Sequence, residues 1–148
     1  MYLFINGTQR LDDWDVILVG SQVLRFRVLP SPREAPAARA HGGRGSTVPD
    51  VDVAVVEQLT DDGSVRDRHH LARGRTLLLG REDGEWVFPY DATMSGLHAE
   101  IGPHPDGGFF VRDVGSRNGV AVAMRGALDV ASGSRLLLDG QMMRVELA

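Results

Sequence analysis

The fold is decided by the stretch from Leu77 to Gly119, which reads LLLGREDGEWVFPYDATMSGLHAEIGPHPDGGFFVRDVGSRNG. Short apolar runs at 85–88, 97–101 and 109–113 alternate with turn residues such as Asp106-Gly107-Gly108. Runs of this length bounded by Gly, Asp and Ser are typical of β-strands joined by tight turns. No helical period of 3.6 is sustained over ten residues, so this stretch predicts antiparallel β-structure.

The same pattern continues on both sides of this stretch. Asp62-Gly63 and Asp139-Gly140 supply further turns. Additional strands are expected at 51–59, 75–79, 120–124, 135–138 and 141–147. Short strands at regular spacing with frequent turns indicate an all-β protein, an antiparallel β-sandwich formed by residues 51–148.

The stretch that precedes this sandwich divides into two parts. Residues 30–50, PSPREAPAARAHGGRGSTVPD, are rich in Pro, Ala and Gly and have no apolar periodicity, so we expect a flexible linker. Residues 1–29 have strand character and predict an N-terminal β-hairpin. The expected organisation is therefore 1–29, 30–50 and 51–148.

An internal repeat relates the two ends of the chain. At a spacing of 119 residues, Ile5-Asn6-Gly7 aligns with Met124-Arg125-Gly126, and Gln22–Phe26 aligns with Gln141–Val145, without a gap. The first 29 residues therefore look like the closing strands of a domain whose body is absent. Chance similarity between two hairpins is the alternative. A lone hairpin buries too little apolar surface, so this segment is expected to dock on the sandwich, to self-associate or to stay loose.

Composition excludes several classes of function. All sixteen basic residues are Arg, and the chain has no Cys, so lysine-based phosphate loops, disulfides, thiolate metal sites, iron–sulfur clusters and cysteine nucleophiles are not expected. No cofactor is predicted. A net charge of −4 argues against nucleic-acid binding by bulk electrostatics. The sequence lacks an apolar run of about 18 residues and a recognisable signal peptide, which favours a cytoplasmic protein without membrane association. The Arg-rich, Lys-free vocabulary is typical of a GC-rich bacterial genome.

Candidate binding residues lie at the ends of three of the expected strands. Gly80-Arg81 ends one apolar run, Ser95-Gly96-Leu97-His98 opens another, and Ser116-Arg117-Asn118-Gly119 follows a third. Loops at one end of a β-sandwich gather in space and form binding surfaces. Two guanidinium groups, a hydroxyl and a carboxamide suit a phosphate group attached to an extended peptide backbone.

The order of these motifs, G-R, then S-x-x-H, then D-x-G-S-x-N-G, resembles the forkhead-associated (FHA) domain. That family comprises phosphothreonine-peptide-binding β-sandwiches, and the resemblance covers nearly all of residues 51–148. Residues 4–26, FINGTQRLDDWDVILVGSQVLRF, resemble the last strands of an FHA domain. The resemblance implies the end of one FHA domain, a linker and a complete second domain.

The resemblance assigns roles by position. Arg81 and Ser95 contact the phosphate, and Asn118 holds the backbone of the bound peptide. Structural support of the site falls to Gly80, His98 and Gly119.

Two positions depart from the family pattern. Gly96 stands where the family commonly has Arg, Lys or Asn, so one phosphate contact is absent. Arg117 stands where the family has Thr or Ser that also touches phosphate. Arg117 either restores a cation to the site, fills the pocket, or pairs with an acid such as Asp91 or Asp113.

The sequence therefore predicts a non-catalytic signalling adaptor that recognises a phosphothreonine motif on a protein partner in a bacterial Ser/Thr kinase pathway. A degenerate FHA domain for phosphate-independent association remains the alternative. A serine hydrolase is disfavoured because Ser95 and His98, three residues apart on or near a strand, are expected to face opposite sides. His69-His70 is expected to be a polar turn, and no metal site is expected.

Overall fold

The computed structural model describes residues 2–30, 52–123, 133–138 and 141–146. The expected linker lies outside the described residues except for Pro30. The second copy of the Ile5-Asn6-Gly7 motif, at 124–126, also lies outside them.

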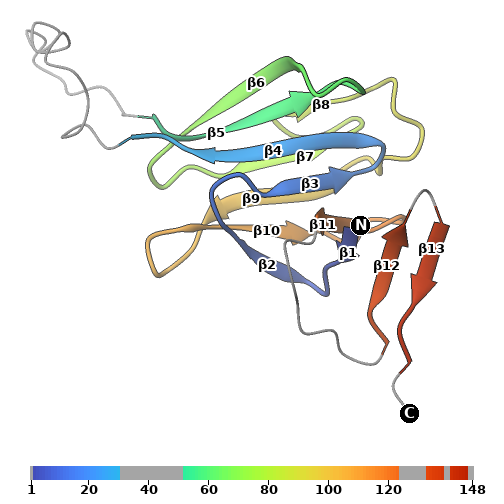
Figure 1. Ribbon diagram of the computed structural model, residues 1–148. Helices are drawn as coiled ribbons and strands as arrows, with labels where there is room; N and C mark the ends of the chain where they lie inside the picture. Colours follow the sequence, from blue (N-terminus) through green and yellow to red (C-terminus); the bar gives the residue numbers. More distant parts are fainter. Residues whose placement is uncertain (1, 31–51, 124–132, 139–140, 147–148) are drawn as a thin grey trace, which may run out of the picture.

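The described residues form two facing β-sheets (Figure 1). The larger sheet has the order β13-β12-β1-β11-β3-β4-β5-β6, and the smaller sheet has the order β2-β10-β9-β7-β8. The strands are β1 (Tyr2–Phe4), β2 (Thr8–Leu11), β3 (Val16–Val19), β4 (Gln22–Val28), β5 (Asp52–Leu59), β6 (Val65–Ala72), β7 (Leu77–Gly80), β8 (Trp86–Val87), β9 (Ala99–Pro103), β10 (Phe109–Asp113), β11 (Val120–Ala123), β12 (Arg135–Leu138) and β13 (Gln141–Arg144). The all-β antiparallel sandwich predicted from the sequence is confirmed, with β7 and β8 as a parallel pair within it.

The core lies between the two sheets and follows the alternation of each strand. Ile17 and Val19 of β3 are fully buried. Leu24 and Phe26 of β4 are buried in the same way, and the Phe26 ring packs against Phe109 of the smaller sheet at a centroid distance of 5.4 Å. Burying a side chain of this size contributes about 1.5–3 kcal/mol to folding. Residues of the N-terminal segment are therefore central to the core.

The N-terminal segment enters both sheets, which differs from the separate hairpin expected from the sequence. β3 pairs with β11, β4 pairs with β5, and β1 lies between β11 and β12. β2 pairs with β10 in the smaller sheet. The strands of this segment pair within the sheets because their apolar side chains are buried only between two facing sheets. A hairpin docked on the outside of the sandwich would leave these side chains exposed to solvent.

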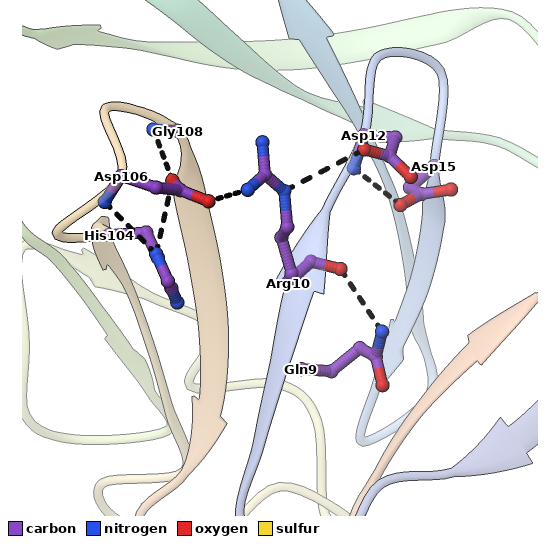
Figure 2. A network of polar contacts seen from close by, with 7 residues as sticks. All are labelled: Gln9, Arg10, Asp12, Asp15, His104, Asp106 and Gly108. Atoms are coloured by element: carbon purple, nitrogen blue, oxygen red, sulfur yellow. Dashed lines mark hydrogen bonds and ion pairs between the residues drawn. The ribbon is translucent and has the colours of Figure 1, made fainter.

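Polar contacts fasten β2 to the smaller sheet (Figure 2). The guanidinium of Arg10 forms an ion pair with Asp106 in the turn between β9 and β10 and lies 3.9 Å from Asp12. Asp106 accepts a hydrogen bond from the backbone N–H of Gly108 at 2.9 Å and lies 3.0 Å from Nδ1 of His104. This network fixes the position of the N-terminal segment at the end of the sandwich opposite the expected binding loops.

One strand was not predicted. β6 has the sequence VRDRHHLA and places His69 and His70 in a strand, so the expected turn at these residues is wrong. The charged side chains of β6 hide its alternation, and pairing with β5 through seven residues makes it a strand. His69 stacks on Trp86 at a centroid distance of 5.6 Å. Among the described residues, no cluster of three or more His, Asp or Glu could hold a metal ion, and no helix could cross a membrane.

Candidate functional site

Three loops at one end of the sandwich surround a pocket of about 370 Å³. The five positions that the sequence predicts for the phosphopeptide site, Arg81, Ser95, Gly96, Arg117 and Asn118, all line this pocket. The lining residues are Arg81, Ala92, Thr93, Met94, Ser95, Gly96, Gly115, Arg117 and Asn118. The loops follow β7, precede β9 and precede β11, so residues far apart in the sequence converge because their strands are held in one sandwich.

Close backbone contact between the first two loops positions Arg81. Its backbone N–H donates to the carbonyl of Ser95 at 2.9 Å, and the N–H of Asp83 donates to the carbonyl of Gly96 at 2.9 Å. A Cβ on Gly80 would lie within 2.5 Å of the Asp83 carbonyl oxygen and closer still to that of Gly96. Only glycine fits this approach. The Arg81 side chain is partly exposed and lies 3.7 Å from Glu82, an exposed ion pair that contributes little to folding.

His98 is fully buried and joins the second loop to the third. Its Nδ1 accepts a hydrogen bond from the backbone N–H of Ser95 at 3.0 Å, and its Nε2 lies 2.8 Å from the carbonyl oxygen of Gly119. Since Nδ1 accepts, the proton is on Nε2 and is donated to Gly119. Both ring nitrogens are occupied by backbone groups, so His98 cannot act as a base for the Ser95 hydroxyl.

The same contact corrects one step of the sequence argument. Ser95 and His98 both lie in the loop before β9, so they do not occupy opposite sides of a strand. The backbone N–H of Ser95 contacts the imidazole of His98 directly. The hydroxyl of Ser95 is directed elsewhere, because its Oγ accepts the backbone N–H of Arg117 at 3.0 Å. This acceptance orients the hydroxyl so that its hydrogen can be donated to a ligand.

Asn118 reaches back across the pocket to the second loop. Its Nδ2 donates to the carbonyl oxygen of Thr93 at 2.8 Å. A carboxamide carries two N–H groups and one oxygen. The remaining groups can therefore donate to and accept from an extended peptide backbone while the side chain is held in place.

The two departures from the family pattern lie together at the pocket. A Cβ added to Gly96 would meet only the Glu82 carboxylate at 3.9 Å, so a side chain fits at this position. Arg117 is exposed and forms no ion pair with any residue that the structure describes. Asp113 accepts a hydrogen bond from the backbone N–H of Ser116, and Asp91 accepts from the backbone N–H of Ser21. Neither acid forms an ion pair with Arg117 in the described part of the chain.

Asp91 anchors the second loop to the N-terminal segment. Its Oδ2 accepts hydrogen bonds from the backbone of Ser21 at 2.9 Å and from the side chain of Gln22 at 3.0 Å, while Oδ1 accepts from the N–H and hydroxyl of Thr93. Burial acts to raise the pKa of Asp91, but the hydrogen bonds from Thr93, Gln22 and Ser21 outweigh it and hold the pKa well below its ordinary value.

We expect Asp91→Asn to be destabilised by about 1–3 kcal/mol at pH 7, because an amide cannot replace the second acceptor oxygen. A carboxyl group whose folded pKa is depressed contributes stability above its unfolded pKa of about 3.9 and loses that contribution as the pH falls through the folded pKa. The stability difference between the parent and Asp91→Asn should therefore narrow below about pH 4. Urea unfolding at several pH values checks this. Asp61→Asn, at an exposed turn position, is the control, and a constant difference for Asp91→Asn would contradict the assignment.

Sequence reasoning did not identify Thr93 as part of the pocket. Thr93 links Asp91 to Asn118, because it donates to the former and its carbonyl accepts from the latter. The available signal was the Asp-x-Thr order, since Asp often accepts the N–H of the residue two positions later in a turn. The sequence indicates Asp91 only as a partner for Arg117.

Residues 77–142 match the FHA domain family. The resemblance stated from the motifs is confirmed over this range, which contains the three loops of the pocket and continues into the hairpin of β12 and β13. The match implies a protein-interaction module of the phosphopeptide-binding type.

One similar protein is the Protein phosphatase 1 regulatory inhibitor subunit PPP1R8 homolog of Arabidopsis thaliana. It is 39% identical over 67 residues, which are 45% of this chain and 18% of the relative. The chain thus matches less than a fifth of that protein. No solved structure matches the chain.

Proposed function

We propose that this FHA domain binds phosphothreonine peptides and serves as a non-catalytic adaptor in a cytoplasmic Ser/Thr kinase pathway of a bacterium. The observation that carries the proposal is the single pocket lined by Arg81, Ser95, Arg117 and Asn118. It combines two cations, a hydroxyl and a carboxamide, which are the groups that a phosphate on a peptide backbone requires.

The internal contacts of the pocket support this proposal. The backbone N–H of Arg117 donates to the hydroxyl oxygen of Ser95, and Asn118 donates one N–H to the carbonyl of Thr93. These bonds leave the hydroxyl hydrogen of Ser95 and the carboxamide oxygen of Asn118 available to a ligand. Ordering these side chains before binding lowers the entropy cost of recognising the ligand. The guanidinium of Arg117 forms no ion pair within the described part of the chain, which leaves it able to pair with an incoming phosphate.

We expect the protein to bind a phosphothreonine peptide library and not the same library after dephosphorylation. A phosphate carries about −1.5 to −2 charges at neutral pH and three acceptor oxygens, so the two arginines gain charge-assisted hydrogen bonds only when it is present. Fluorescence anisotropy titrations of both libraries measure the difference. Equal affinity would overturn this proposal and favour phosphate-independent association, the alternative function.

A second prediction concerns the cation that Arg117 supplies. Exposed charges are screened by salt, with a Debye length of about 10 Å at 0.1 M. Phosphopeptide affinity should therefore fall as salt rises, and Arg117→Thr should bind more weakly and show a flatter salt dependence. Because position 96 has room for a side chain, Gly96→Arg in the Arg117→Thr background should restore affinity and the salt response.

Arg112→Thr is the matched control for this series. Arg112 is also an exposed arginine. It lies on β10, forms an ion pair with Glu100 of β9 at 3.0 Å, and does not line the pocket. Its replacement should leave binding unchanged. An Arg117→Thr protein that binds as well as the parent, with the same salt response, would show that Arg117 does not serve the phosphate.

A further inference from the structure

The chain contains two hairpins with the same register. In the hairpin of β3 and β4, Ile17 pairs with Leu24 and Val19 with Gln22. In the hairpin of β12 and β13, Leu136 pairs with Met143 and Leu138 with Gln141. Each partner in the second hairpin lies 119 residues after its counterpart in the first, the spacing of the sequence repeat. Chance similarity between two sequences would not by itself place corresponding residues opposite each other in both hairpins.

The two hairpins occupy different places in the same sheet (Figure 1). β3 and β4, drawn in blue, lie between β11 and β5, and their inward side chains are buried. β12 and β13, drawn in orange and red, lie at the edge beside β1. There Met142 and Met143 are 54% and 50% exposed. The hairpin of β3 and β4 is thus part of the core, whereas the hairpin of β12 and β13 is partly exposed to solvent.

The place between β11 and β5 makes specific polar demands on its occupant. The buried carboxylate of Glu57 on β5 accepts a hydrogen bond from Nε of Arg25 at 2.8 Å. Nε2 of the buried Gln58 donates to Gln22 at 2.8 Å, and Gln22 in turn donates to Asp91. An occupant without these two side chains leaves buried polar groups unsatisfied, which is costly.

The C-terminal hairpin carries both of the required side chains at the required positions. Gln141 corresponds to Gln22, and Arg144 corresponds to Arg25. The apolar position of Leu24 is matched by Met143. Since β13 lies at the edge, Gln141 and Arg144 are exposed there, and no ion pair of Arg144 occurs among the described residues.

The C-terminal hairpin can also reach this place within its own chain. β11 pairs antiparallel with β3, with Val122 opposite Ile17, so the end of β11 lies beside the start of β3. Eleven residues, 124–134, connect Ala123 to β12. A chain of this length spans up to about 36 Å, whereas neighbouring strands are about 4.8 Å apart.

We propose that the place between β11 and β5 is a binding site for a hairpin and that residues 135–146 are its second occupant, alternating with residues 16–28 of the same chain. The family match agrees with this exchange, because it includes residues 135–142 and excludes residues 16–28. When the C-terminal hairpin is bound, Gln141 replaces Gln22 beside Asp91 and the N-terminal hairpin is released. The released hairpin then exposes Leu24 and Phe26 for association with other molecules.

One contact makes the N-terminal hairpin the preferred occupant. Phe26 packs on Phe109, whereas the corresponding residue is the smaller Val145. The exchange therefore favours the arrangement seen in the structure and keeps the other as a minor state.

The test compares three variants of the full chain by thermal unfolding and circular dichroism. Leu24→Asp places a charge in the core and should expel the N-terminal hairpin, yet the chain should still unfold cooperatively at a lower Tm because residues 135–146 replace it. Met143→Asp, at a half-exposed position, should leave the Tm unchanged. The double variant should show no cooperative transition. A Leu24→Asp protein that is unfolded, or a double variant that is folded, would overturn the proposal.

A disulfide reports the exchange directly and does not depend on a destabilised variant. Val23 pairs with Leu59 on β5, and Met142 corresponds to Val23. Five strands separate β13 from β5 in the structure, a distance of roughly 25 Å or more at about 4.8 Å per strand. Since the chain has no native Cys, the Leu59→Cys, Met142→Cys protein can form only this one disulfide within a chain.

We expect this protein to form a disulfide-linked monomer slowly in the otherwise unchanged chain and at least tenfold faster with Leu24→Asp. The control pair Asp52→Cys, Met142→Cys places the first cysteine at the far end of β5 and should not cross-link in either background. A protein that stays reduced would overturn the proposal. A disulfide-linked dimer would also overturn it, because the hairpin would then come from a second copy.

Discussion

Arg81→Ala is expected to weaken phosphopeptide binding by about 10- to 100-fold while the thermal stability stays nearly unchanged. A charge-assisted hydrogen bond contributes about 1.5–3 kcal/mol, and about 1.4 kcal/mol corresponds to a factor of ten in affinity. The folded protein loses only the exposed contact between Arg81 and Glu82 at 3.7 Å. Isothermal titration with one phosphothreonine peptide and a melting curve measure the two effects separately.

His98→Ala is the matched comparison. We expect it to lower the thermal stability more than Arg81→Ala does. Removing the imidazole leaves the backbone N–H of Ser95 and the carbonyl of Gly119 without their partner inside the protein. The cost should be about 1–3 kcal/mol of folding free energy for each group left unsatisfied. A larger drop in Tm for Arg81→Ala than for His98→Ala would contradict the roles of both residues.

Gly80→Ala is expected to lose about 3 kcal/mol of stability together with phosphopeptide binding, because the new methyl group overlaps backbone atoms, which cannot move like a side chain. Relief of this overlap must separate β7 from the second loop and break the bonds that the backbone of Arg81 and Asp83 makes with Ser95 and Gly96. Urea unfolding and peptide titration of the same preparation measure the two losses.

Gly96→Ala is a control for this substitution on the other side of the same contact. Its methyl group would meet only one carboxylate oxygen of Glu82, at 3.9 Å, so the stability should change by no more than about 0.5 kcal/mol. If Gly80→Ala and Gly96→Ala behave alike, the close approach of the two loops does not hold the site together.

The loops of the site could be predicted from the sequence because each one carries its own signal. Arg81 follows an apolar run that ends in Gly80, and Asn118 precedes the glycine that opens β11. Their convergence in one pocket follows from the sandwich, since strands of one fold bring their end loops together. The internal contacts of the pocket could not be predicted in this way. That Ser95 accepts from Arg117, and that Thr93 holds Asn118, depends on distances between loops that are 20 or more residues apart.

The sequence by itself determined most of the strands, because alternation and glycine-rich turns are local properties. β6 is the exception, since its charged side chains hide the alternation. The sequence also determined that two hairpins share one pattern, from Gln22–Phe26 to Gln141–Val145. Only the tertiary structure decided which of them is built into the sandwich. Both hairpins carry the Gln and Arg side chains that can hydrogen-bond Gln58 and Glu57, so the sequences of the hairpins alone do not distinguish them. The choice depends on a contact with the opposite sheet, because Phe26 fills the space against Phe109 and the smaller Val145 cannot.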